Sequence, residues 1–221
     1  MNKSKPRDEY FNHEEVYKNI LNLNRRLRKI IEHKKESEFS DIDLEISGLM
    51  HQMTYFSTLV QVLYPLERTY HLFRLSPKNP NPDNVIEKHV EAVDFNCRKS
   101  FLVLTAFSFE TLLGVISKTY SISLDGCGSM DQKYLRIMDF FDIEREEYQN
   151  LIKIFYYTRN TLHSGTHVTR DSSPLTYKGK TFFFEIGQSH VEHTTWNYFT
   201  YFAHEIVSIF EKIYKSQKFN K

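Results

Sequence analysis

Two side chains near residue 160 are of the types that handle phosphate and protons. Arg159 carries a permanently charged guanidinium, and His163 carries an imidazole, whose charge changes near neutral pH. Side chains four residues apart point to the same side of an α-helix. A phosphate held by Arg159 would therefore lie within reach of His163, and this pairing suggests RNA chemistry.

The element that must position this pair is a helix expected at about 144–164. Its apolar residues repeat at helical spacing on one face, and Gly165 follows as a plausible C-cap. A longer helix is expected at about 84–120. Its middle is apolar on nearly all sides, which predicts the central and most buried element. Glu110 stands among those apolar residues and needs a partner, for which Arg159 is the natural candidate.

The N-terminal part predicts two further helices. The first, 12–36, has an apolar stripe, and its other face is basic: Arg25, Arg26, Arg28, Lys29, Lys34 and Lys35. That face is either simply solvated or a contact surface for RNA phosphates. The second is expected to have Ser40 or Asp41 as its N-cap, and Pro65 is expected to kink or divide it. The proline-rich stretch 76–83 is the best internal boundary, either a connector in one bundle or a hinge.

The C-terminal part is expected to contain a β-hairpin between two helices. A short helix is expected at 131–142. Residues 175–186 have a Lys-Gly turn between two β-prone runs, which predicts a hairpin packed on the helices. A last helix starts at Thr194 or Thr195 and runs to about 215. The sequence therefore predicts one all-α domain over 1–221, a bundle of about six helices with a small β-hairpin inserted before the last helix.

Composition narrows the classes of protein further. The 221 residues include 18 Phe and 14 Tyr but only 7 Gly and 6 Pro, and the net charge is +1. Nucleic-acid binding would need a local concentration of charge. Two cysteines, a polar N-terminus and the absence of a sufficiently long apolar run predict a soluble cytoplasmic protein without a membrane segment. His163, His167, His190 and His193 complete no known metal motif, and neither a metal nor a cofactor is expected.

The segment Arg159-Asn-Thr-Leu-His-Ser-Gly165 resembles the HEPN superfamily, all-helical domains whose signature is an Arg, often followed by Asn, with a His shortly after. A long central helix with an acidic residue, here Glu110, and an insertion before the final helix add to the likeness. The resemblance covers roughly 83–216, a HEPN-like core. Residues 1–76 form an N-terminal helical extension without an assigned counterpart.

This resemblance implies a metal-independent endoribonuclease of toxin or phage-defence type that acts as a homodimer with facing motifs. Arg159 would hold the scissile phosphate, His163 would move a proton, and Asn160 would orient the pair. Tyr156 and Tyr157 would stack on bases or pack in the core or dimer interface. Glu110 and His167 are further supporting residues. The implied partners are RNA and an antitoxin or other protein.

The spacing of the motif is compact, because only three residues separate Arg159 from His163, fewer than the usual family pattern has. Each residue turns a helical side chain by about 100°. Two other interpretations therefore stay open. One is a catalytically silent helical domain that binds RNA, a nucleotide or a protein. The other is a structural polar cluster that ties helices together.

Overall fold

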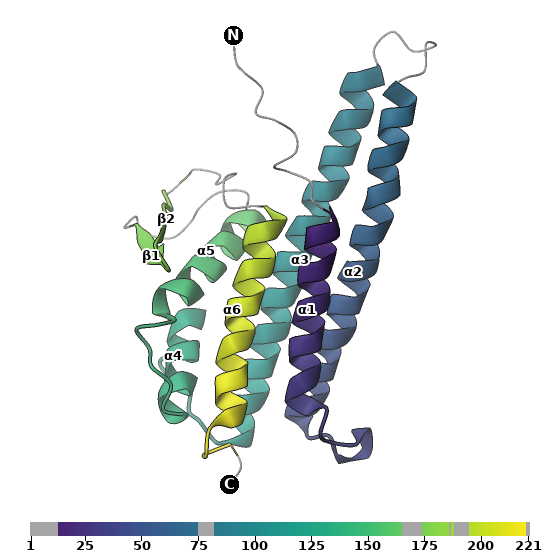
Figure 1. Cartoon of the computed structure of the whole chain (residues 1–221). Coiled ribbons are helices and arrows are strands. Elements are labelled where there is room, and N and C mark those ends of the chain that lie inside the picture. The colour runs from purple at the N-terminus through teal and green to yellow at the C-terminus, as the bar shows by residue number, and fades with distance from the viewer. Residues whose placement is uncertain (1–12, 75–81, 165–173, 186, 188–194, 220–221) are drawn as a thin grey trace.

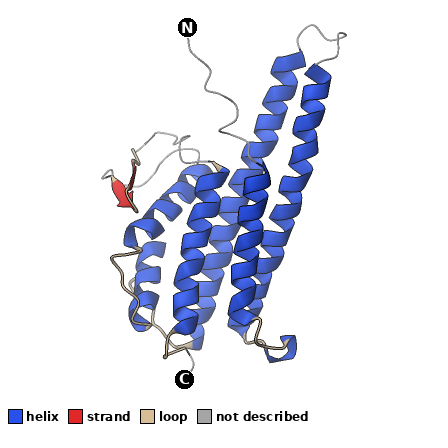
Figure 2. Ribbon diagram, viewed as in Figure 1, coloured by secondary structure: helices blue, strands red, loops and turns tan. Residues whose placement is uncertain are grey.

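The computed structural model describes residues 13–74, 82–164, 174–185, 187 and 195–219. It is an all-α bundle with a small antiparallel hairpin before the last helix, as the sequence predicts (Figures 1 and 2). The helices longer than one turn are α1 (His13–Ile31), α2 (Asp41–Arg74), α3 (Pro82–Thr119), α4 (Met130–Phe140), α5 (Gln149–Ser164) and α6 (Trp196–Lys215). A 3-10 turn, η2, spans Glu36–Glu38, and the strands are β1 (Leu175–Tyr177) and β2 (Lys180–Phe182).

α3 is the central helix, since it packs against α2, α4, α5 and α6. α1 lies beside α2 and α6, and α2 and α3 run antiparallel as the two longest helices (Figure 1). The core between them is rich in aromatic rings. Phe109 of α3, for example, meets Phe155 of α5 and Phe210 of α6 at centroid distances of 6.1 and 5.5 Å.

The structure differs from the expected elements in three places. Pro65 does not divide α2, which is helical from Asp41 to Arg74; a proline removes only one backbone donor, and the long helix continues on both sides of it. The motif helix starts at Gln149 and not near 144, because Arg145–Tyr148 form a separate turn closed by the Tyr148 amide on the Arg145 carbonyl. The middle of α3 is not enclosed on all sides: Leu104 is 46% exposed and Phe107 is 44% exposed.

The hairpin forms where the Lys-Gly turn predicts it. Lys178 and Gly179 both have positive φ, 45° and 76°, which matches the right-handed twist of a tight hairpin. Leu175 pairs with Phe182, and both side chains are buried against the helices. The Asn150 side chain of α5 donates to the Thr176 carbonyl at 2.9 Å. The strands are thereby attached to the helix that carries the motif.

A buried carboxylate joins the start of α2 to the end of α6 and to the segment between α1 and α2. Asp43, in the first turn of α2, is fully buried and accepts hydrogen bonds from the Ser40 amide, the Ser40 hydroxyl, the Lys34 ammonium at 2.8 Å and the Tyr214 hydroxyl of α6. The Asp43 amide in turn reaches Ser40 Oγ at 3.3 Å, which confirms Ser40 as the cap of α2. Burial opposes ionisation of Asp43, but the hydrogen bonds from Lys34, Ser40 and Tyr214 outweigh it and lower the pKa.

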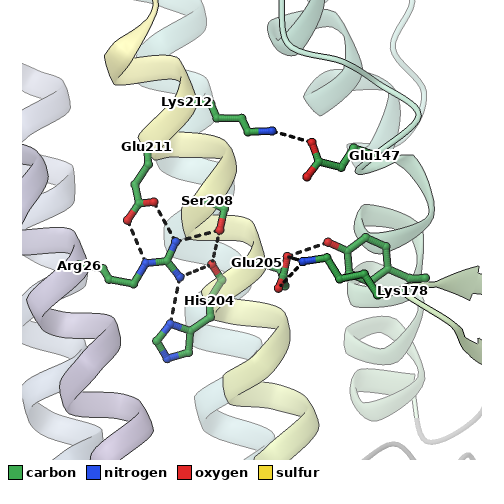
Figure 3. Close-up of polar contacts among 9 residues, drawn as sticks. Arg26, Glu147, Lys178, His204, Glu205, Ser208, Glu211 and Lys212 are labelled. Carbon is green, nitrogen blue, oxygen red and sulfur yellow. Dashed lines mark hydrogen bonds and ion pairs between the residues drawn. The ribbon is translucent and has the colours of Figure 1, made fainter.

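A second polar tie joins α1 to α6. Figure 3 shows that Arg26 of α1 contacts three residues of α6: His204, Ser208 and Glu211. On the other side of α6, Glu205 binds Lys178 and Lys212 binds Glu147. Arg26 Nη1 lies 3.1 Å from His204 Nδ1, and His204 Nε2 lies 2.9 Å from the Asn19 carbonyl. A guanidinium only donates and a carbonyl only accepts, so His204 is the neutral Nε2–H tautomer. Burial and the Arg26 charge lower the pKa of His204.

Asp43→Asn is expected to lower the free energy of unfolding by about 3 kcal/mol at pH 7, because it breaks a buried ion pair from one side. The stabilisation by ionised Asp43 is complete above the ordinary pKa of 3.8 and is lost as the pH falls through the lower folded-state pKa. Urea unfolding at pH 7 and pH 3 measures the difference. Asp41→Asn, at an exposed position two residues away, is the control and should cost below about 1 kcal/mol. Equal losses would contradict the assignment.

The lowered pKa of His204 predicts a second pH effect. Below the ordinary value of 6.5 the unfolded chain takes up a proton that the folded protein refuses, so stability falls as the pH drops from 6.5 toward the folded-state pKa. His204→Gln, which keeps a donor and an acceptor, should flatten this part of the stability profile. Thermal unfolding between pH 7 and pH 5 tests it. An unchanged slope in the variant would show that His204 does not titrate in this way.

Candidate functional site at the end of α5

The last two turns of α5 separate a buried face from an exposed end. Leu162 and Thr161 are buried, and the Thr158 and Thr161 hydroxyls donate to the carbonyls of the residues four positions earlier, each at 2.8 Å. His163 and Ser164 are exposed. The buried threonines and leucine therefore fix the helix while its terminal imidazole faces solvent.

The Arg159 guanidinium lies in a partly enclosed place between α5 and α3, and its side chain is 17% exposed. Its Nη1 donates to Asn160 Oδ1 at 2.9 Å, and its Nη2 lies 3.9 Å from Glu110 Oε1. Its Cζ atom lies 4.5 Å from the centroid of the Phe107 ring, within the range of a cation–π contact. Within the part of the chain that the structure describes, the buried Nε has no hydrogen-bond partner. The guanidinium is thus held in position but only partly satisfied.

Glu110 is the acidic neighbour that the sequence predicts, although the contact is long. Its side chain is 24% exposed. Burial raises the pKa of Glu110, and the positive charges of Arg159 and Lys133 only partly offset this effect. At 3.9 Å the pair is an electrostatic contact without the short hydrogen bonds of a bidentate Arg–carboxylate pair. Glu110 therefore does not neutralise Arg159 as a tight partner would.

The two tyrosines before the motif have different places. Tyr156 is 5% exposed, its hydroxyl lies 3.4 Å from that of the buried Tyr134, and burial raises its pKa. It belongs to the core and offers no ring face to a base. Tyr157 is half-buried, with its ring edge-on to Phe184 at 5.4 Å. His167 lies outside the described residues, as does the proposed cap Gly165.

The basic face of α1 is partly used inside the fold. Arg26 is held by Glu211, and Lys34 is held by Asp43. Arg25, Arg28, Lys29 and Lys35 remain exposed. In the parts of the chain that the structure describes, no group of three or more His, Cys, Asp or Glu side chains is close enough to hold a metal ion.

The site contains one feature that sequence reasoning missed, the aromatic platform of Phe107. The signal was present: Phe107 and Glu110 are three residues apart on one helix, so the side of α3 that offers Glu110 to Arg159 also offers Phe107. The apolar pattern of the sequence places Phe107 with the core residues, whereas the structure places its ring against the guanidinium.

The chain, compared with protein-family models, with curated proteins and with solved structures, has no match in any of the three.

Glu110→Gln tests how much the ion pair between Glu110 and Arg159 contributes to the free energy of unfolding. A carboxyl with a raised folded-state pKa loses stability as the pH rises above the ordinary value of 4.5. The neutral isostere should therefore be as stable as the wild type at pH 7, or more stable by up to about 1 kcal/mol, and this advantage should shrink toward pH 4.5. Chemical denaturation at the two pH values measures it. A loss of stability at pH 7 would mean that the pair is tightly coupled.

Proposed function

We propose that this chain is a HEPN-like, metal-independent endoribonuclease of toxin or phage-defence type, with its site at the C-terminal end of α5. The observation that supports the proposal most is the combination at that end of an exposed His163 and, one turn earlier, a guanidinium with an unsatisfied Nε. Cation and proton carrier are thus neighbours on one rigid helix. The proposal includes a homodimer in the cytoplasm, with RNA as substrate and an antitoxin or other protein as partner.

The chemistry needs only these groups. Arg159 binds a non-bridging oxygen of the scissile phosphate and offsets the negative charge that grows there during attack. His163 takes the proton of the 2′-hydroxyl while that oxygen forms a bond to phosphorus. The bond from phosphorus to the 5′-oxygen breaks, and the protonated His163 gives its proton to this leaving oxygen. The products are a 2′,3′-cyclic phosphate and a 5′-hydroxyl, and the enzyme returns to its starting state.

Neighbouring residues act by positioning Arg159. Asn160 Oδ1 accepts from Nη1 and fixes the plane of the guanidinium, while Phe107 supports one face of it. Glu110 draws Nη2 toward α3, but at 3.9 Å it leaves this donor available to a closer anion. A phosphate would therefore compete with Glu110 for Arg159, and the raised pKa of Glu110 weakens the competitor.

A second candidate is a catalytically silent domain that binds RNA, a nucleotide or a protein partner. The low exposure of Arg159, 17%, favours it, because a side chain packed on Phe107 and near Glu110 also has a structural role in joining α5 to α3. Such a domain would still use the exposed end of α5 as a contact surface. It differs from the enzyme in one property, turnover.

Cleavage of a fluorescently labelled RNA in EDTA separates the two candidates. Wild-type protein should cut it, and His163→Ala should lower the rate by about 10²–10⁴-fold, the usual contribution of a general acid or base. Arg159→Lys keeps the charge and should retain more activity than Arg159→Ala. His33→Ala, at another exposed histidine after the end of α1, is the matched control and should cut normally.

Cleavage that is equal in wild type and His163→Ala would contradict the enzyme. RNA retention by fluorescence anisotropy without product, lost in Arg159→Ala, would establish the binding domain instead. Analysis of the new ends adds a further check, since a product with a 3′-phosphate formed without a cyclic intermediate would contradict the attack by the 2′-hydroxyl.

A further inference from the structure

The α2–α3 pair carries a long surface without charge. From Ile46 to Leu66 the chain of α2 contains no Asp, Glu, Lys or Arg, and from Phe101 to Ser117 the only such residue of α3 is Glu110. Glu110 turns toward Arg159 of α5, so it does not lie at the centre of the outer side of α3. The largest apolar patch on a protein surface is often an interaction site.

Large apolar side chains gather on the outer side of both helices. On α2, Leu44, Tyr55 and Val62 are each more than half exposed, and Gly48 lies in the same row. On α3, Leu104 and Phe107 are nearly half exposed, followed by Gly114. Spacings of three, four and seven residues place each set on one helical face. We call these seven residues the α2–α3 face: Leu44, Gly48, Tyr55, Val62, Leu104, Phe107 and Gly114.

The two rows lie side by side. Gln52 accepts a hydrogen bond from Ser108 at 2.6 Å, and the Phe56 and Phe101 rings are 5.1 Å apart, which fixes the level at which the antiparallel helices meet. Tyr55 is therefore level with Leu104, and Leu44 is level with Gly114. The face is one continuous surface that runs along both helices, with the Gln52 and Ser108 side chains between the rows.

We propose that the α2–α3 face binds a second copy of this chain, with the same face of each subunit in contact. In a twofold contact, a charged residue close to the symmetry axis faces its own copy and is repelled by it. An uncharged face therefore suits self-association better than a charged one. The core of an interface is likewise depleted in charge and enriched in aromatic residues. Methyl groups added at Gly48 or Gly114 would touch nothing, which leaves room there for side chains of the partner.

The size of the face agrees with this occupant. At 1.5 Å per residue the α2 row from Leu44 to Val62 is about 27 Å long, the α3 row from Leu104 to Gly114 is about 15 Å long, and each helix is about 10 Å wide. The projected area is therefore about 400 Å², which the relief of the side chains enlarges toward the roughly 600 Å² per partner at which standard interfaces begin. α2 belongs to the extension that the HEPN resemblance does not cover, so the face is a property of this chain.

Other occupants fit less well. A nucleic acid needs cations, and the face has none. Ala92–Thr119 of α3 has the length and composition of a membrane span, with 44% of its most apolar window buried inside the protein. A helix that lies on a bilayer has Lys and Arg beside its apolar face, which α2 lacks between Ile46 and Leu66.

Sedimentation velocity tests the proposal with paired charge variants. Wild type should sediment with twice the monomer mass. An acidic variant, Tyr55→Glu with Leu104→Glu, and a basic variant, Tyr55→Lys with Leu104→Lys, should each raise the dimer dissociation constant at least about tenfold. An equal mixture of the two should form dimers again, because opposite charges then meet across the contact. Phe183→Glu, at an exposed phenylalanine of similar accessibility outside the face, should remain dimeric.

Circular dichroism verifies that each variant is folded, which is expected because both replaced side chains are well exposed. A wild type that stays monomeric at every concentration, acidic or basic variants that still dimerise, or a mixture that stays monomeric would each overturn the proposal. Co-sedimentation of wild type with phosphatidylcholine vesicles, lost in the acidic variant, would assign the face to a membrane and overturn it too. A dimer that persists in the charge variants overturns the assignment of this face and leaves the ribonuclease proposal standing, whereas the RNA cleavage assay tests the ribonuclease without testing the face.

Discussion

The proposed chemistry depends on a guanidinium whose hydrogen-bond donors are only partly satisfied. Arg159 is supported by the Phe107 ring, tied to Asn160 and drawn toward Glu110, yet the Glu110 carboxylate oxygen is 3.9 Å away, and among the described residues the buried Nε has no partner. A buried cation with a tight ion pair would be structural only, whereas a fully exposed one would not be oriented. Arg159 lies between these limits. Because Arg159 lies one turn before an exposed histidine on α5, a phosphate bound by its free donors would lie beside a group that can move a proton.

α3 positions Arg159 because each side of this helix has different neighbours. Phe109 and its buried neighbours pack the core, Phe107 and Glu110 contact Arg159, and Leu104 with Phe107 forms part of an exposed apolar surface. Phe107 belongs to both of the latter groups. A partner on the α2–α3 face would therefore lie next to the residue on which the guanidinium rests. The proposed contact and the proposed site are adjacent but separable, since one is apolar and the other is charged.

The fold was predictable because its signals are local. Helical repeats, the Lys178-Gly179 turn and the Ser40 cap each act within a few residues, and the structure confirms all of them. The contact between Glu110 and Arg159 was also expected, from the cost of a lone carboxylate in an apolar helix. The cation–π contact with Phe107 and the exposure of Leu104 were not. Both depend on which side of α3 its neighbours leave uncovered, and an apolar sequence alone does not specify that.

The most direct test of the account is NMR of selectively labelled protein titrated with an RNA whose scissile 2′-hydroxyl is replaced by hydrogen. This ligand offers the phosphate but cannot be cut. If Arg159 and His163 bind one phosphate, the His163 ring signals and the Arg159 guanidinium signals shift together with one dissociation constant, while the signals of the exposed His33 stay in place. Shifts at His163 without Arg159, or at neither residue under conditions in which the RNA binds, would contradict a shared phosphate site at the end of α5.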